Sequence, residues 1–301
     1  MPRFLVTTFE RLLLVDLDRD WTLNRVRVLH EGRGIYFGLA RDGRRIWVAE
    51  RNLDIHKMPR AATAPVNGIA LWHRGIFGGF KRSGMVVTNT AFEDLHQIAY
   101  DQGAHFITTS RPPFLVRRDL ATGHVTDVSL EDALPARLRR PEGGNLDRYH
   151  VNSVAVSQER LWVLAHNWDR PSFALSMDRT AAHMGRAEAV EIHENVGSCA
   201  HDVLPDGNGA WVLDSAGAAL VRIGSEQPER FSIDGTRRQP FPRGLARNGR
   251  KLLLTHGFWS AERDARAQSD AMARVFDICT GEMGPPMLLG AHGNTCAVMA
   301  I

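Results

Sequence analysis

The chain has 301 residues, of which 44% are hydrophobic and 24% charged, a composition typical of a globular protein that buries a substantial core. Its 37 basic and 34 acidic residues leave a formal charge of only +3, which gives no support to a nucleic-acid-binding function. Glu10 and Arg11 interrupt the first apolar run, which excludes a signal peptide or a membrane span there.

Three cysteines, Cys199, Cys279 and Cys296, lie far apart and form no CxxC pair. This spacing argues against a disulfide framework and against a thiolate zinc site. We therefore expect a cytoplasmic protein that binds neither nucleic acid nor membrane, and the oligomeric state stays open.

An internal repeat predicts the fold. After strands expected at residues 4–8 and 12–16, five segments each carry a short apolar run, a polar turn and a second apolar run, at residues 37–50, 96–109, 152–165, 201–214 and 243–256. Turns such as Asp42-Gly43, Asp206-Gly207 and Asn248-Gly249 supply the positive φ that tight hairpins need. Starts roughly 50 residues apart suit four-stranded propeller blades with loops of variable length.

Residues 114–119 and 219–223 are expected to be outer strands of these blades, and 260–272 a loop or a short surface helix. The final run, 294–301, reads as an innermost strand without a partner after it. Pairing it with the N-terminal strands would complete a sixth blade and remove an exposed edge. We predict an all-β protein, a single six-bladed β-propeller domain over residues 1–301, closed by the C-terminal strand.

Residues 39–50 (LARDGRRIWVAE) and 201–223 (HDVLPDGNGAWVLDSAGAALVRI) resemble six-bladed propellers of the gluconolactonase and regucalcin type and NHL-like propellers. The resemblance implies the fold and, for the lactonase-like enzymes, a divalent metal held on the channel axis by Glu, Asn and Asp. In this chain, histidines stand at the expected axial positions. Residues 147–167, 191–214 and 243–266 are also similar to uncharacterised bacterial propeller proteins, and this similarity implies no particular reaction.

Polar residues gather at one end of the predicted hairpins. The start of the first strand and the end of the second strand of each hairpin should lie on one face of the propeller. The starts carry His96, His150, Asn152, His201, Asp202 and Arg243. The ends carry Glu50, Arg51, Ser110, Arg111, His166, Asn167, Asp214, Ser215 and His256. The opposite turns carry ordinary turn residues. This asymmetry predicts one functional face at the mouth of the channel.

Imidazole is the commonest nitrogen ligand of Zn²⁺ or Fe²⁺, and an open coordination position would activate water or polarise a substrate. The preferred ligands are His96, either His150 or His166, and His201, with His256 as a possible fourth. Zn²⁺ and Fe²⁺ are favoured over Ca²⁺. The alternative is that each histidine is a structural residue bonded to a neighbouring blade.

Asp202 and Asp214 are candidate catalytic residues that orient an imidazole or accept a proton, and otherwise cap strand ends. Arg111 and Arg243 are candidates for pairing with a substrate carboxylate or phosphate, and otherwise bond to carbonyls. Gly143 and Gly144 lack the strand and helix of a phosphate-binding loop. Trp47, Trp162 and Trp211 occupy equivalent blade positions and are expected to pack between strands.

These features favour a metal-dependent hydrolase, lyase or isomerase that acts on a small polar metabolite. Two alternatives stay open. One is a non-catalytic propeller that binds a ligand or serves as a scaffold, and the other is a metal-free lyase or cyclase that uses a His–Asp acid/base pair.

Overall fold

The structure is a computed structural model that describes residues 1–31, 35–53, 66–76, 78–87, 95–112, 114–141, 146–234 and 238–301. Gly143 and Gly144, predicted to lie in a loop, fall outside these residues. The chain divides into two compact units. Unit 1 comprises Met1–Asn89, Ala218–Leu220 and Arg230–Ile301, and unit 2 comprises Thr90–Gly217 and Val221–Glu229. The prediction of a single domain stays a prediction.

Among the described residues, three antiparallel sheets belong to unit 1. The first has the order β25-β1-β2-β3, formed by Thr295–Ala300, Arg3–Thr8, Arg11–Leu17 and Leu23–Glu31. The second runs β4 to β7, formed by Ile35–Asp42, Arg45–Leu53, Val66–Arg74 and Phe80–Val87. The third runs β20 to β23, formed by Pro240–Asn248, Lys251–Phe258, Ala271–Asp277 and Glu282–Met283, with β24 (Met287–Gly290) also pairing with β22.

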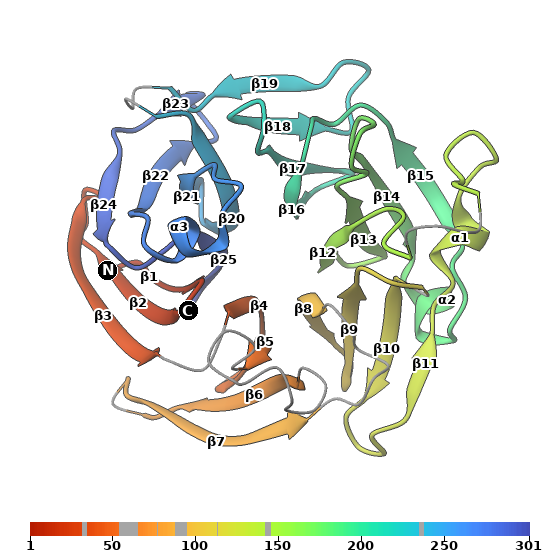
Figure 1. Cartoon of the computed structure of the whole chain (residues 1–301), viewed down its shortest axis with the longest axis horizontal. Helices are drawn as coiled ribbons and strands as arrows, with labels where there is room; N and C mark the ends of the chain where they lie inside the picture. The colour runs from red at the N-terminus through yellow and green to blue at the C-terminus, as the bar shows by residue number, and fades with distance from the viewer. Residues whose placement is uncertain are drawn as a thin grey trace. The chain divides into compact units, whose positions relative to one another are not determined.

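Three further sheets begin in unit 2 (Figure 1). Strands β8 to β11 are Leu95–Asp101, Ala104–Thr109, Leu115–Asp119 and Val125–Asp127. Strands β12 to β15 are Val151–Val156, Arg160–Ala165, Phe173–Asp178 and Ala189–His193. Strands β16 to β19 are His201–Asp206, Gly209–Asp214, Ala219–Ile223 and Glu229–Ser232. The six sheets, with all five predicted hairpins in place, confirm the all-β, six-bladed β-propeller class.

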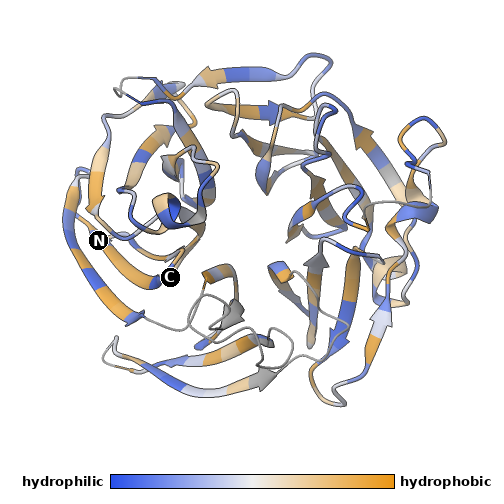
Figure 2. Ribbon diagram, viewed as in Figure 1, coloured by the Kyte–Doolittle hydropathy of each residue, from blue (hydrophilic) through white to orange (hydrophobic). Residues whose placement is uncertain are grey.

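The C-terminal strand closes a sheet with the N-terminus, as predicted. Strand β25 pairs antiparallel with β1, with Leu5 opposite Met299 and Val6 opposite Val298. Leu5 and Val6 are buried, so this pairing both satisfies backbone hydrogen bonds and builds core. Figure 2 shows β2 as largely hydrophobic and β3 alternating between hydrophilic and hydrophobic residues, the pattern of an inner and an outer strand.

Each innermost strand is irregular near one end. The pairing register shifts between Leu95 and Ile98 in β8, between Val151 and Ser153 in β12, and between His201 and Val203 in β16. Similar shifts occur in β4, β20 and the β1–β25 pair. Such bulges redirect side chains and are common beside functional sites. The predicted site residues of unit 2 lie next to them.

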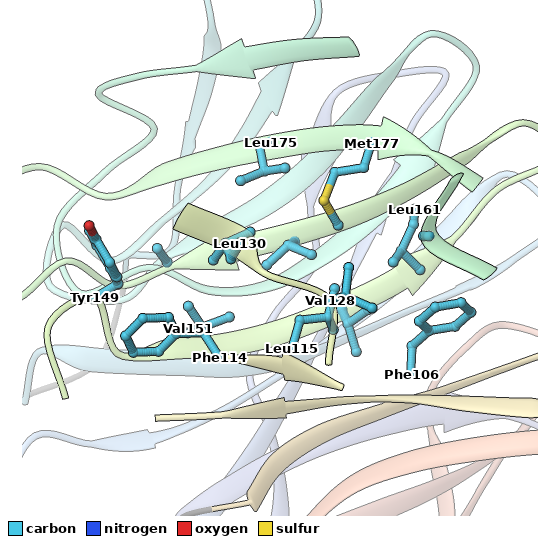
Figure 3. Close-up of a cluster of buried hydrophobic side chains, with 14 of the residues drawn as sticks. Phe106, Phe114, Leu115, Val128, Leu130, Tyr149, Val151, Leu161, Leu175 and Met177 are labelled. Atoms are coloured by element: carbon cyan, nitrogen blue, oxygen red, sulfur yellow. The ribbon is translucent and has the colours of Figure 1, made fainter. Parts of the chain in front are cut away.

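A buried apolar cluster supports the strands of unit 2. It includes Phe106, Tyr149, Leu161, Leu175 and Met177, all fully buried (Figure 3). Trp47, Trp162 and Trp211 are also buried, which agrees with their predicted packing role.

Helices are short among the described residues: α1 is Leu130–Ala133, α2 Arg179–His183 and α3 Arg263–Ala267. The last falls in the segment predicted as a loop or short surface helix. None of the helices in the described ranges has the length and apolar composition needed to traverse a bilayer.

Candidate functional site

Four predicted histidines come together in unit 2. His96 lies in β8, His150 directly before β12, His166 directly after β13 and His201 at the start of β16. Strand β12 packs beside both β8 and β16. The ring centroids lie 4.7 Å apart for His96 and His150, 5.2 Å for His150 and His166, and 5.8 Å for His166 and His201. We call these four side chains the histidine row.

The backbone around the histidine row is strained. Non-glycine residues with positive φ include His150 (46°), Asn167 (64°), Trp168 (52°), Cys199 (52°) and Asp202 (54°). L-residues adopt this left-handed region at a steric cost, and for a residue as bulky as tryptophan it is an outlier. Strain of this kind persists only where the surroundings enforce it, and it gathers at functional sites.

Asp147 holds His150. The Oδ2 of Asp147 lies 2.7 Å from Nδ1 of His150, and each side chain is 15% exposed. A carboxylate accepts but does not donate, so Nδ1 carries a proton and the neutral ring presents a lone pair on Nε2. Among the described residues, no hydrogen bond engages that Nε2. His150 can therefore accept a proton from a bound molecule.

His166 has the opposite tautomer. Its Nδ1 accepts a hydrogen bond from the backbone N–H of Trp168 at 3.1 Å, so the proton of the neutral ring sits on Nε2. The backbone N–H of His166 donates to the carbonyl of His150 at 3.2 Å. Neighbouring imidazoles thus offer an acceptor at His150 and a donor at His166.

His201 is held by Ser215, whose Oγ lies 2.8 Å from its Nδ1. The adjacent bulge residue Asp202 accepts a hydrogen bond from Nε2 of Gln97 at 3.2 Å. Asn152 donates through Nδ2 to the carbonyl of Ala200 at 2.9 Å, while its buried Oδ1 has no hydrogen-bond partner among the described residues. Asn152 thus links β12 to the residue before β16, and the Gln97–Asp202 hydrogen bond links β8 to β16, the two strands on either side of β12.

Asp214 caps a loop. Its Oδ1 accepts hydrogen bonds from the backbone N–H groups of Ser198 at 2.9 Å and Gly217 at 3.0 Å. A Cβ added at Gly197 or Gly217 would come within 2.6 or 2.3 Å of this side chain, so both positions need glycine. Arg111 is exposed, and its carbonyl accepts from the backbone N–H of Phe114 and from Thr109 Oγ1. The proposed catalytic roles of Asp214 and Arg111 stay predictions.

The two remaining candidates, His256 and Arg243, belong to unit 1. Burial lowers the pKa of His256 to about 4, so its imidazole is neutral near pH 7. The carbonyl of Arg243 accepts from Thr255 and Thr295, and its guanidinium lies 5.6 Å from the ring centre of Phe241.

The predicted metal can be tested against the donor geometry. Imidazole nitrogens are suitable donors for Zn²⁺ or Fe²⁺. In the part of the chain that the structure describes, however, no three His, Cys, Asp or Glu side chains converge on one point as a metal site requires.

Asp147 and Trp168 were not among the residues predicted for the site. Asp147 precedes His150 by three positions in a loop, and Trp168 follows His166 and Asn167. The Asp-x-x-His spacing was the available signal, but it lies outside the repeated hairpins from which the site was predicted.

Comparisons with known proteins define the fold. No protein-family model matches the chain. No curated protein matches it in sequence either. Solved structures of the same class do match. A chain in a crystal structure of a nidogen–laminin complex has 11% identity and a TM-score of 0.67, over 100% of this chain and 98% of that one.

Two bacterial proteins give similar matches. One from Lactobacillus plantarum has 12% identity and a TM-score of 0.59 over 100% of both chains. The other, from Bacteroides fragilis and provisionally assigned as a 6-phosphogluconolactonase, has 11% identity and a TM-score of 0.55 over 97% of this chain and 83% of that one. The expected fold-level similarity to propellers of this kind is confirmed, and at such identities it carries the fold alone.

Proposed function

We propose that this protein is an enzyme that transfers protons on a small polar substrate, with His150 as the base, Asp147 as the residue that orients it, and His166 as a hydrogen-bond donor. The observation that carries the proposal is the Asp147–His150 pair, in which Nδ1 is engaged and Nε2 is not, beside a second imidazole of opposite tautomer.

The arrangement suits elimination, isomerisation or hydrolysis. In each, one group removes a proton from carbon or from water, and a second protonates or polarises an oxygen. His150 Nε2 takes up the proton to give an imidazolium that Asp147 stabilises, and the Nε2–H of His166 donates a hydrogen bond that stabilises negative charge on the oxygen while staying on its ring. The proton on His150 then passes to the substrate oxygen or carbon, or to water, which returns His150 to its neutral form.

A second Asp–His pair in unit 2 shows what a structural pair looks like. His183, in α2, has Nε2 2.8 Å from Oδ2 of Asp101, and its Nδ1 accepts from Nε of Arg117 at 3.3 Å. Both ring nitrogens are therefore engaged within the protein. The contrast favours a chemical role for His150 over the purely structural role that the sequence left open.

The metal-dependent version is the second candidate, supported by four imidazoles in one row. It would need at least three donors to move onto a common point from the positions described above. The proposal also keeps the small-molecule substrate and the cytoplasmic location expected from the sequence. A non-catalytic ligand-binding role is the outcome that would replace both versions.

The test is a turnover screen with panels of hydroxy acids, sugar acids, esters and lactones, followed by matched variants. His150→Gln should lower kcat at least about 100-fold, the usual contribution of a general base. His183→Gln, which removes the structural pair, should leave kcat near that of the wild type. An active His150→Gln variant would refute the proposal, and absence of turnover with saturable binding would indicate a binding module.

A further inference from the structure

We infer that Trp168 is a stacking platform in this site, and that the substrate is a ring-bearing small molecule. The inference deepens the proposed function and rests on it, since it names the substrate class of the same site. It rests on the exposure of one side chain, on the hydrogen bond that anchors it, and on the strained backbone that carries it.

Trp168 is exposed and yet fixed in place. It is 43% exposed, whereas Trp162 and Trp211 in the same unit are buried. Its indole Nε1–H donates to the carbonyl of Asp147 at 2.6 Å. Its ring centre lies 4.7 Å from that of His150 and 5.4 Å from that of His166. The polar edge of the indole is thus satisfied, and the side chain stays partly exposed beside the two imidazoles.

The backbone that presents this ring is held in an unfavourable conformation by a dense set of hydrogen bonds. Asn167 and Trp168 are consecutive residues with φ of 64° and 52°. Asn167 is buried. Its backbone N–H donates to the carbonyl of Tyr149 at 2.8 Å, and its side-chain Nδ2 donates to the carbonyl of Pro171 at 2.8 Å. Arg140 donates to both its side-chain and backbone oxygens. The strain is therefore fixed by the fold, as at sites where geometry serves binding.

The indole of Trp168 indicates which class of small molecule binds at this site. An indole face attracts a flat or cyclic molecule through stacking contacts over its whole area, which an open chain cannot make without losing conformational freedom. A cationic ring would gain a further attraction to the indole face. The contacts around Trp168 therefore favour a ring, whatever its charge.

The test uses the indole N–H signals of the seven tryptophans in ¹H–¹⁵N spectra, with Trp168→Phe assigning one of them. The probes are two matched pairs, benzoate with hexanoate and myo-inositol with sorbitol, titrated to about 50 mM, above the millimolar Kd expected for such small molecules. We expect at least one ring compound to shift the Trp168 signal saturably and its open-chain match to bind about tenfold more weakly.

Variants separate stacking from structure. Trp168→Ala should weaken binding of the ring probe about tenfold, Trp168→Phe should weaken it less because a ring remains, and Met184→Ala, which removes another exposed apolar side chain of unit 2, should have no effect. Binding for the Ala variant is followed by the His150 ring signals.

The inference fails if the open-chain probes bind as well as the rings, if no probe shifts the Trp168 signal, or if Trp168→Ala binds the ring probe as tightly as the wild type. Saturable ring binding through Trp168 in a protein without turnover would support the platform and overturn the enzyme proposal. Loss of turnover in His150→Gln together with unchanged ring binding in Trp168→Ala would support the enzyme proposal and overturn the stacking platform.

Discussion

Nδ1 of His150 lies 2.7 Å from Oδ2 of Asp147 in the loop that leads into β12, and His150 itself has a φ of 46°. The carboxylate and the backbone together fix which nitrogen carries the proton and how the ring is oriented. Fixing the tautomer of a base in this way is a common role for a carboxylate beside histidine.

The state of His150 can be measured without a substrate. Diethyl pyrocarbonate acylates an unprotonated, accessible imidazole nitrogen, which His150 offers at Nε2. His150 and His183 have nearly equal side-chain exposure, 15% and 16%, but both nitrogens of His183 are engaged. Peptide mass spectrometry should show His150 modified several-fold faster than His183. Equal rates would mean that Nε2 of His150 is blocked.

Metal dependence has its own test. Protein purified without a histidine tag and dialysed against a strong chelator should keep its thermal unfolding midpoint and any activity found in the screen, because the described side chains do not gather three donors on one point. Metal content should be well below one ion per chain. Stoichiometric Zn²⁺ or Fe²⁺, lost together with activity in His201→Ala, would instead favour the metal-dependent enzyme.

The fold was predictable because its signals are local and repeated. Asp206-Gly207 marks the turn between β16 and β17, and the apolar runs on either side form the paired strands. The closure by β25 could be predicted because the last expected strand, at residues 294–301, has no partner strand after it in the sequence. Both arguments need only turn chemistry and strand alternation.

The site was predictable only where it coincides with the repeat. His96, His150, His166 and His201 stand at equivalent hairpin ends, so the repeat placed them together. Asp147 and Trp168 lie in connecting loops, whose course is set by tertiary contacts such as the bonds to Asn167. The capping role of Asp214 depends on the close approach of Gly197 and Gly217, which no sequence pattern shows.

Removing the closing strand should unfold unit 1. A chain that ends at Asn294 loses β25, leaves β1 with an unpaired edge and removes the buried side chains Ala297 and Val298. We expect cooperative thermal unfolding, followed by circular dichroism, to be lost. Cys296→Ala keeps the strand and serves as the control, with an unfolding midpoint close to that of the wild type. A truncated chain with a wild-type midpoint would show that closure is dispensable.

The core of unit 2 should be sensitive to cavities. Leu175 is fully buried in β14 and belongs to the cluster of Figure 3, so Leu175→Ala should lower the free energy of unfolding by about 2–5 kcal/mol. Met184→Ala, at a position 64% exposed, should change it by less than about 0.5 kcal/mol. Urea unfolding measures both. A loss below about 1 kcal/mol for Leu175→Ala would mean that the cluster is loosely packed.

His193 should make stability depend on pH. Its ring stacks on Trp162, with centroids 5.6 Å apart and planes 15° from parallel. Burial lowers the pKa of His193 below its ordinary value of 6.5, although Glu191 opposes the shift. As pH falls through about 6.5, the unfolded chain therefore takes up a proton that the native ring refuses, and the free energy of unfolding decreases until the lower native pKa is reached. His193→Phe keeps an aromatic ring for Trp162 but cannot titrate. Urea unfolding of both proteins between about pH 8 and pH 5.5 should show a smaller loss of stability in the variant. Parallel curves would mean that His193 has the same affinity for protons in the native and unfolded chains.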